Sequence, residues 1–551
     1  MTSDNESNKS QVIIIETYPG VHDSELIENI KNKFHPDAFF NVADCYKSEN
    51  EIDGITYPDV TTDRIFGYMT RLTIDAFFDE AKLAQMRSAL SNAPGLKIVY
   101  GTGACFAAKN WDTLVYADMA RWEIQQRMRR QEVSNLGTSN FDLEISRKYK
   151  RAFFVDWRVA DRIKRQTFEQ WDYVLDTNTA DEPKMIHVSD YKLALAQVVN
   201  RPFRVVPFFD PGPWGGQWMK EVCDLDRSQE NFAWCFDCVP EENSLLLRFG
   251  DATIEIPSNN LVFFQSKALL GERVFARFGA EFPIRFDFLD TMGGGNLSLQ
   301  VHPLTEYIRE QFGMYYTQDE SYYLLDASED AVVYLGMKEG IDKVAMINDL
   351  RAAQNGGTAF DADKYVVKWR AKKHDHFLIP AGTVHCSGEN TMVLEISATP
   401  YIFTFKLWDW GRLGLDGLPR PINIEHGAKV IQWDRDESWV KDNLINAVSE
   451  IDKGNGWVEE RTGLHEFEFI ETRRHWFTEK VFHHTGGSVN VLNLIEGSEA
   501  IVESPTDAFD PFIVHFAETF IIPENVREYS IRPYGESAGQ KIATIKAFVK
   551  S

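Results

Sequence analysis

The spacing of apolar residues along the chain changes character near residue 230. Before that point, apolar runs such as QVIIIETYPG (11–20) alternate with segments of helical spacing such as SELIENIKNKF (24–34), which predicts a doubly wound α/β domain. After it, SLLLRFGDATIEIPSNNLVFF (244–264) and IRFDFLDTM (284–292) have the pattern of short strands, with Gly, Pro and Asn at the breaks. Antiparallel strands of this kind close readily into barrels, so a mostly-β region of jelly-roll barrels is predicted.

The length of the chain indicates several domains. A chain of 551 residues exceeds the size at which single cores stop growing, about 250–300 residues. We predict an α/β domain without catalytic activity at residues 1–200, a metal-binding β domain that carries the chemistry at 201–425, and a C-terminal β domain at 426–551.

The α/β domain lacks a recognisable phosphate loop. TYPGVHDSEL (17–26) follows the first predicted strand but contains neither GxxxxGKS/T nor a Lys, and GTGAC (101–105) is too short for a dinucleotide-binding loop. ADMARWEIQQRMRR (117–130), a strand ending in Asp and then an Arg-rich helix, resembles uridine-kinase-type P-loop folds. That resemblance implies a P-loop-kinase-like domain that has lost phosphoryl transfer and serves regulation or assembly. The alternative is a Rossmann-like module.

The segment LSLQVHP (297–303) predicts a strand whose two faces differ. Side chains alternate along a strand, so Gln300 and His302 lie on one face and three apolar residues on the other. Glu320 opens a second apolar strand, and His385 closes a third. Two imidazoles, a carboxylate and an amide oxygen form a plausible donor set for a divalent metal such as zinc. The alternative is that both histidines are structural and held by hydrogen bonds.

The order and spacing of several segments resemble the class I mannose-6-phosphate isomerases. The segments are VVPFFDPGPWGGQWM (205–219), LSLQVHP, EYIREQFG (306–313), DESYYLLDA (319–327), FLIPAGTVH (377–385) and FKLWDWGRLGLDGLPRPINI (405–424). The resemblance covers residues 201–551 and implies two cupin barrels, with one zinc ion per chain held by Gln300, His302, Glu320 and His385. It also implies the interconversion of mannose 6-phosphate and fructose 6-phosphate, in which a proton moves between C2 and C1 through an enediol.

Charged residues around WDWGRLG (408–414) are candidates for the chemistry of the substrate. The resemblance suggests Arg412 for substrate contact and proton relay, with Asp409 as its orienting partner, and the alternative for this pair is a structural salt bridge. Lys406, Arg420 and Lys373 are candidates for binding the phosphate group.

Two departures from the family's pattern keep other functions open. Gln318 stands two residues before Glu320, where many family members carry Lys, and Asp210 stands where Lys or Arg is frequent. One alternative is therefore a non-catalytic metal-binding cupin that senses or binds a sugar phosphate. A second is another cupin enzyme, such as an iron dioxygenase, which its metal content would reveal.

The composition of the chain indicates which kinds of partner it binds and where in the cell it is located. The formal net charge of -25 disfavours nucleic acid, whose phosphates need clustered Lys and Arg. Six irregularly spaced cysteines do not indicate a disulfide framework, and Cys235 and Cys238 fall in a predicted buried strand. No run of about 18 apolar residues is present, and the polar opening MTSDNESNKSQ is unlike a signal peptide. We expect a cytoplasmic protein, monomeric or oligomeric, that acts on a small sugar phosphate and has no membrane partner.

Overall fold

The computed structural model describes residues 10–399, 402–413, 420–463, 465 and 467–550. Its internal contacts divide the chain into two compact units. The first comprises Met1–Ala196 with Ser244–Asn260, and the second comprises Gln197–Asn243 with Leu261–Ser551. The hairpin of β9 (Ser244–Phe249) and β10 (Ala252–Pro257) therefore belongs to the first unit, although in the sequence it lies between two segments of the second.

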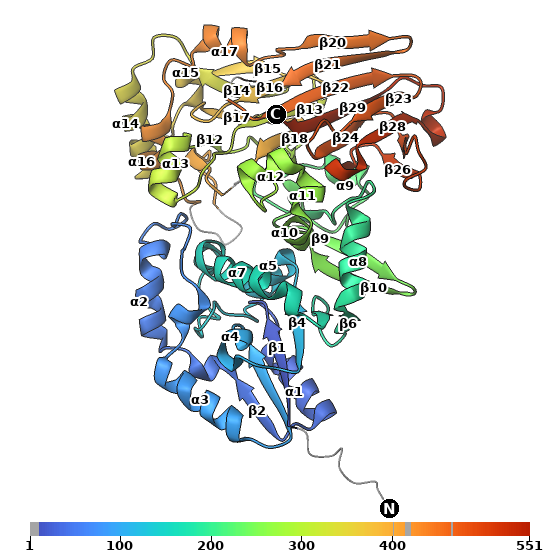
Figure 1. Ribbon diagram of the computed structural model, residues 1–551. Helices are drawn as coiled ribbons and strands as arrows, with labels where there is room; N and C mark the ends of the chain where they lie inside the picture. Colours follow the sequence, from blue (N-terminus) through green and yellow to red (C-terminus); the bar gives the residue numbers. More distant parts are fainter. Residues whose placement is uncertain (1–9, 400–401, 414–419, 464, 466, 551) are drawn as a thin grey trace, which may run out of the picture. The chain divides into compact units, whose positions relative to one another are not determined.

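A six-stranded sheet in the order β2-β3-β1-β4-β5-β6 forms the centre of the first unit (Figure 1). The first five strands in this order are parallel, and β6 pairs antiparallel with β5. The strands are β1 (Gln11–Thr17), β2 (Ala38–Asn41), β3 (Leu96–Gly101), β4 (Thr113–Asp118), β5 (Tyr173–Asp176) and β6 (Lys184–His187). The helices are α1 (Asp23–Phe34), α2 (Glu49–Val60), α3 (Glu80–Asn92), α4 (Ala104–Ala108), α5 (Arg121–Arg129), α6 (Ile145–Arg151), α7 (Trp157–Thr167) and α8 (Val188–Val198), whose last residues belong to the second unit.

Apolar strand residues and one face of each helix make the core of this unit. Leu26 and Ile30 of α1 pack against Ile15 of β1 and Ile98 of β3. Because the strands carry apolar residues on both faces, helices can cover both, as expected for a buried parallel sheet. The predicted alternation of strands and helices is confirmed, whereas a relationship to P-loop kinases or Rossmann folds stays a prediction.

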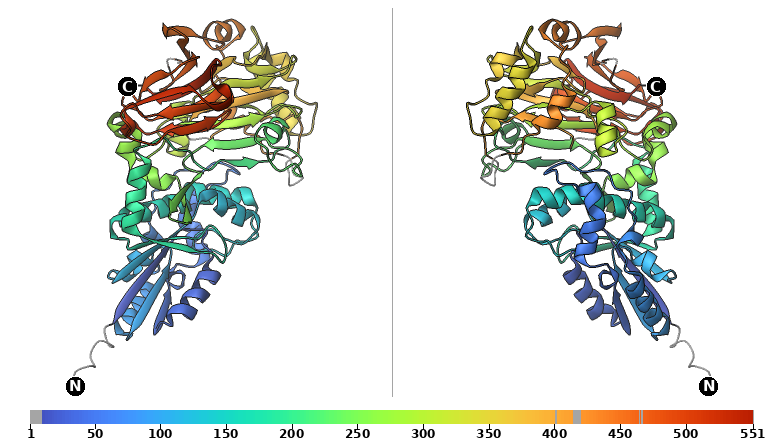
Figure 2. Two further views of the ribbon diagram at one scale, coloured as in Figure 1. Left: turned by 90° about the vertical axis from the view of Figure 1, so that its right-hand side faces the viewer. Right: turned by 90° about the vertical axis from the view of Figure 1, so that its left-hand side faces the viewer.

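Antiparallel sheets make up the second unit, with α14 (Lys343–Gln354) at its periphery (Figure 2). The sheets that carry the candidate site have the orders β16-β13-β18-β11-β8-β7 and β15-β14-β17-β12-β19. Their strands are β7 (Phe208–Asp210), β8 (Trp234–Cys238), β11 (Ile284–Asp290), β12 (Leu299–Val301), β13 (Glu320–Ala327), β14 (Val332–Met337), β15 (Val366–Arg370), β16 (His376–Ile379), β17 (His385–Ser387), β18 (Thr391–Ala398) and β19 (Phe405–Trp408). Further helices are α9 (Trp218–Val222), α10 (Asn259–Phe264), α11 (Ser266–Leu270), α12 (Glu272–Phe278), α13 (Thr305–Phe312), α15 (Ala362–Tyr365), α16 (Ile424–Val430) and α17 (Glu437–Asn443).

The C-terminal part of the second unit forms two more antiparallel sheets, in the orders β20-β21-β22-β29-β24-β27 and β23-β28-β25-β26. Phe477, Leu492, Phe520 and Ile531 contribute to the apolar core of this part. Its strands are β20 (Ser449–Gly454), β21 (Trp457–Gly463), β22 (Ile470–Phe477), β23 (Val481–His484), β24 (Asn490–Glu496), β25 (Glu499–Glu503), β26 (Phe512–His515), β27 (Thr519–Ile522), β28 (Glu528–Pro533) and β29 (Ile542–Val549).

These sheets are open, in contrast to the closed barrels predicted from the strand pattern. Each strand order in the described residues runs from one edge strand to another. Strands such as β12 and β17 are three residues long and share a single paired position, Gln300 with His385, so they are too short to continue the ladder around a closed barrel.

Two further observations concern the cysteines and the helices. All six cysteines are free thiols, and Cys235 and Cys238 are buried in β8. In the part of the chain that the structure describes, no helix is both long enough and apolar enough to cross a membrane.

Candidate metal centre

Three strands bring the four predicted ligands together. Gln300 lies in β12 with His302 directly after it, Glu320 begins β13 and His385 begins β17. The Nε2 atoms of His302 and His385 lie 3.1 and 2.7 Å from the two carboxylate oxygens of Glu320. The Gln300 Nε2 atom lies 3.2 Å from His385 Nε2. The donor atoms of the three ionisable residues all lie within 4.8 Å of one another, an arrangement that can hold a metal ion.

The opposite nitrogen of each imidazole is held by a backbone carbonyl. His385 Nδ1 lies 2.8 Å from the Thr383 oxygen, and His302 Nδ1 lies 3.4 Å from the Phe403 oxygen. A carbonyl only accepts, so Nδ1 carries a proton and Nε2 is the ring atom of each imidazole that faces the Glu320 carboxylate. At such distances a positive charge, a proton or a metal ion, is needed between each Nε2 atom and the carboxylate. The donor set therefore fits a bound metal, with the carbonyls fixing each ring as outer-shell partners.

Burial makes this need for a cation stronger. His385 is 0% exposed, and His302 and Glu320 are each 1% exposed. The His302 Nε2 and Glu320 Oε1 atoms are buried without a hydrogen-bond partner among the described residues. Burial raises the pKa of Glu320, but the two imidazoles outweigh it and hold that pKa well below its ordinary value. Glu320 is therefore an ionised carboxylate, which is the form that binds metal.

A turn and a distant arginine set the position of His385. Gly382 has a φ of +89° in the turn before β17, and its N–H donates to the His302 carbonyl at 2.9 Å. The buried Arg435 guanidinium donates to the carbonyls of Pro380 and Ala381, each at 2.7 Å. Arg435 was missed because it lies some 50 residues away and carries no recognisable motif.

Gln318 separates two buried carboxylates. Its Nε2 donates to Glu320 Oε2 at 2.9 Å and to Glu395 Oε1 at 3.2 Å. Burial, with the charge of Glu320 as the next cause, raises the pKa of Glu395 to about 7 against the attraction of Arg285. Glu395 also escaped the sequence analysis, although a Glu within the apolar strand TMVLEISA is a signal for a functional carboxylate.

A cluster of cations adjoins the ligand set. Lys406 of β19 is directly opposite Gln300 in the register, so the two side chains share a face. Removal from water and the charge of Arg420 lower the pKa of Lys406 to about 8. Asp409 bridges two guanidinium groups, with Arg412 at 2.5 Å and Arg420 at 3.0 Å. One carboxylate thus balances two guanidinium groups, and Lys406 adds to the excess of positive charge when its ammonium group is protonated. Residues 414–419 of the same predicted segment lie outside the described residues.

The fourth predicted basic residue, Lys373, lies elsewhere. The Lys373 Nζ atom lies 2.6 Å from Glu496 of β24, and His374 lies 3.2 Å from the same carboxylate. Lys373 precedes β16 at the end that pairs with Tyr323, whereas the opposite end of β16 pairs with Glu320. The structure therefore groups Lys406, Arg412 and Arg420 but not Lys373.

Parts of the chain are similar to known proteins. Residues 2–200 match the family described as Domain of unknown function (DUF8485). The chain is 27% identical over 154 residues to the mannose-6-phosphate isomerase ManA of Bacillus subtilis, which is 28% of this chain and 45% of that protein. It is 31% identical over 220 residues to the mannose-6-phosphate isomerase of Streptococcus mutans, 40% of this chain and 64% of that protein. Part of the chain is therefore homologous to mannose-6-phosphate isomerases. The matched part spans about half, 45%, of the length of the Bacillus relative.

A solved structure supports the fold. The crystal structure of the mannose 6-phosphate isomerase from Bacillus subtilis matches with a TM-score of 0.50 at 17% identity, and the match covers 63% of this chain and 99% of that one. At an identity this low the match shows a shared fold and nothing more, and that fold is a cupin fold.

Proposed function

We propose that this chain is a zinc-dependent isomerase that interconverts mannose 6-phosphate and fructose 6-phosphate. The observation that carries the proposal is the buried donor set of His302, Glu320 and His385 beside the cations of β19 and the segment after it. The partial homology to mannose-6-phosphate isomerases supports the choice of reaction. In this proposal Gln300 completes the set of zinc ligands.

The chain's own residues would bind and orient the sugar phosphate. Zinc, when bound, supplies a Lewis acid that polarises the sugar oxygens at the reacting carbons. Lys406, Arg412 and Arg420 provide positive charge for the phosphate, and Asp409 holds the two guanidinium groups in fixed directions. The paired guanidinium groups suit a phosphate better than flexible ammonium groups do, because they donate in a planar fork.

Glu395 is our candidate for moving the proton between C2 and C1. The Gln318 side chain donates hydrogen bonds to both Glu395 and Glu320 and so links the two carboxyl groups. The Glu395 pKa of about 7 suits a group that both accepts and donates a proton near neutral pH. A Glu395→Gln variant should retain its zinc and lose most of its turnover, by about 100-fold or more. Loss of zinc together with turnover would instead assign Glu395 to supporting the ligands.

A coupled assay tests the proposed function. Fructose 6-phosphate formed from mannose 6-phosphate is measured with zinc-loaded protein, with His302→Ala and with His484→Ala, a control at an exposed histidine of β23. We expect turnover in the wild type and in His484→Ala, and loss of both zinc and turnover in His302→Ala. Zinc binding without turnover in the wild type would refute the isomerase.

The second candidate is a cupin that binds a sugar phosphate without converting it. Gln318 favours it, because a neutral amide occupies the position between Glu320 and Glu395 where many family members carry Lys. Saturable binding of mannose 6-phosphate that needs Arg412 but yields no fructose 6-phosphate would support this candidate. Iron in the purified protein, together with oxygen uptake, would point to a dioxygenase.

A further inference from the structure

A cavity of about 510 Å³ opens in the first unit at the carboxyl ends of β1 and β3. The chain leaves β1 toward β2 and β3 on one side of the sheet, and continues with β4 and β5 on the other. Ligands of open α/β sheets bind outside the carboxyl ends of strands at such a reversal, in pockets of roughly 300–1,000 Å³. Its walls are the loop after β1 (17–24), residues 101–102 after β3, and the segment after α5 (132–138), with Tyr46 and Phe141.

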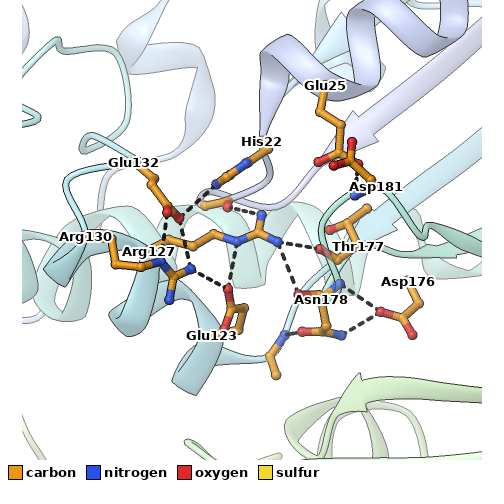
Figure 3. A network of polar contacts seen from close by, with 12 residues as sticks. His22, Glu25, Glu123, Arg127, Arg130, Glu132, Asp176, Thr177, Asn178 and Asp181 are labelled. Atoms are coloured by element: carbon orange, nitrogen blue, oxygen red, sulfur yellow. Dashed lines mark hydrogen bonds and ion pairs between the residues drawn. The ribbon is translucent and has the colours of Figure 1, made fainter.

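A network of polar contacts around the buried Arg127 holds two of these walls in place (Figure 3). The Arg127 guanidinium donates to the Gly20 carbonyl in the loop after β1 at 3.1 Å and to the Thr177 carbonyl after β5 at 2.7 Å. His22 lies 3.3 Å from Glu132, which also accepts from Arg130 at 2.8 Å. The loop after β1 is therefore tied both to α5 and to the segment that follows it, so the cavity is formed before any ligand arrives.

Glycine is required in both of the walls that this network joins. Gly20 has a φ of +108°, and a Cβ there would lie 2.8 Å from the Ile124 side chain. Gly137 has a φ of +70°, and a Cβ there would lie 2.6 Å from the Ile52 side chain. The sequence is thus specialised to shape this cavity.

The chemistry of the lining disfavours a phosphorylated ligand. The described lining residues include Asp23 and Glu132 but no Lys or Arg. In the loop after β1, the Tyr18 N–H donates to the Ala117 carbonyl and the Val21 N–H to the Tyr18 carbonyl, so these amides are not available to a phosphate. Carboxylates and carbonyls accept hydrogen bonds, and they therefore suit a ligand rich in donors.

Aromatic side chains supply the apolar part of the site. Tyr46 is buried with its hydroxyl bound to the Thr102 carbonyl at 2.6 Å, and Phe141 is 44% exposed at the other wall. Rings of this kind offer flat faces to a ring-shaped ligand. We propose that this cavity binds a small, unphosphorylated, hydroxylated ring compound, a free sugar or a nucleoside, at a site separate from the metal centre.

Isothermal titration calorimetry on the full chain tests this proposal. Methyl mannoside stands for a free sugar and adenosine for a nucleoside, while ATP and inorganic phosphate serve as phosphorylated probes. We expect one of the two neutral probes to bind with a dissociation constant of about 1 mM or lower. Binding should persist in His302→Ala, which alters the metal centre of the other unit. Failure of both neutral probes, or loss of binding in His302→Ala, overturns the proposal.

Two variants locate the binding. Ser24→Trp fills the cavity, whereas Asn32→Trp introduces the same side chain at an exposed position two turns further along α1. Ser24→Trp should weaken binding at least tenfold and Asn32→Trp should leave it unchanged. Phe141→Ala removes an exposed wall residue without disturbing the core, and should weaken binding in the same way. Binding of ATP or phosphate that Ser24→Trp abolishes would overturn the assignment of an unphosphorylated ligand.

Discussion

Gln318→Leu removes the amide that lies between two buried carboxylates. Its effect on stability, compared with and without zinc, tests whether Glu320 faces a metal. Gln318 Nε2 donates to Glu320 at 2.9 Å and to Glu395 at 3.2 Å. Hydrogen bonds to charged groups contribute about 1.5–3 kcal/mol each, so the free energy of unfolding of the metal-free protein should fall by about 3–6 kcal/mol. In the zinc-loaded protein Glu320 has the metal as a partner, so the loss should be about half as large.

Urea unfolding of the metal-free and zinc-loaded forms measures both losses. Gln318→Lys is the matched control, since it retains a donor between the same carboxylates and should lose less stability than Gln318→Leu. Its turnover also shows what the family's usual residue does in this chain. Equal losses with and without zinc would refute the assignment of Glu320 as a ligand, and no loss in either form would refute the role of Gln318 as a bridge.

Three further predictions concern charge and position. Lys406→Met should raise KM for the sugar phosphate by about 10–100-fold with unchanged zinc content, an effect of about 1.4–2.8 kcal/mol. In the wild type KM should rise above pH 8, as the ammonium group of Lys406 with its pKa of about 8 loses its proton, and a KM independent of pH would contradict this role. Arg435→Met should weaken zinc binding by about 10–100-fold, because the turn that positions His385 loses its hydrogen-bond donor. A competitive chelator titration measures the zinc affinity. An unchanged affinity would show that the turn keeps its conformation without Arg435. Burial raises the pKa of Glu16 to about 7 in the folded protein, so the first unit should lose up to about 3 kcal/mol of stability as pH rises from about 4.5 to 7. Glu16→Gln should remove this dependence, and the same pH profile in both proteins would contradict it.

The sequence alone indicated the alternation of elements and the candidate metal donors. Alternation along LSLQVHP placed Gln300 and His302 on one face, and the strand pattern placed Glu320 at a strand start, both of which the structure has. His385 was expected to close a strand, whereas it begins β17 after a turn. These features follow from local periodicity, which neighbouring residues fix among themselves. The alternation of strands and helices in the first unit is local in the same sense.

Tertiary structure alone decided which residues surround those donors. Arg435 reaches the turn before His385 from some 50 residues away, and Glu395 of β18 meets Gln318, which lies just before the neighbouring strand β13. Lys373 was grouped with Lys406 by charge, yet it pairs with Glu496 in another sheet. The open sheets and the cavity of the first unit likewise depend on how distant segments pack. Sequence periodicity assigns a side chain to a face, but contacts across long separations are selected by the packing of the whole fold.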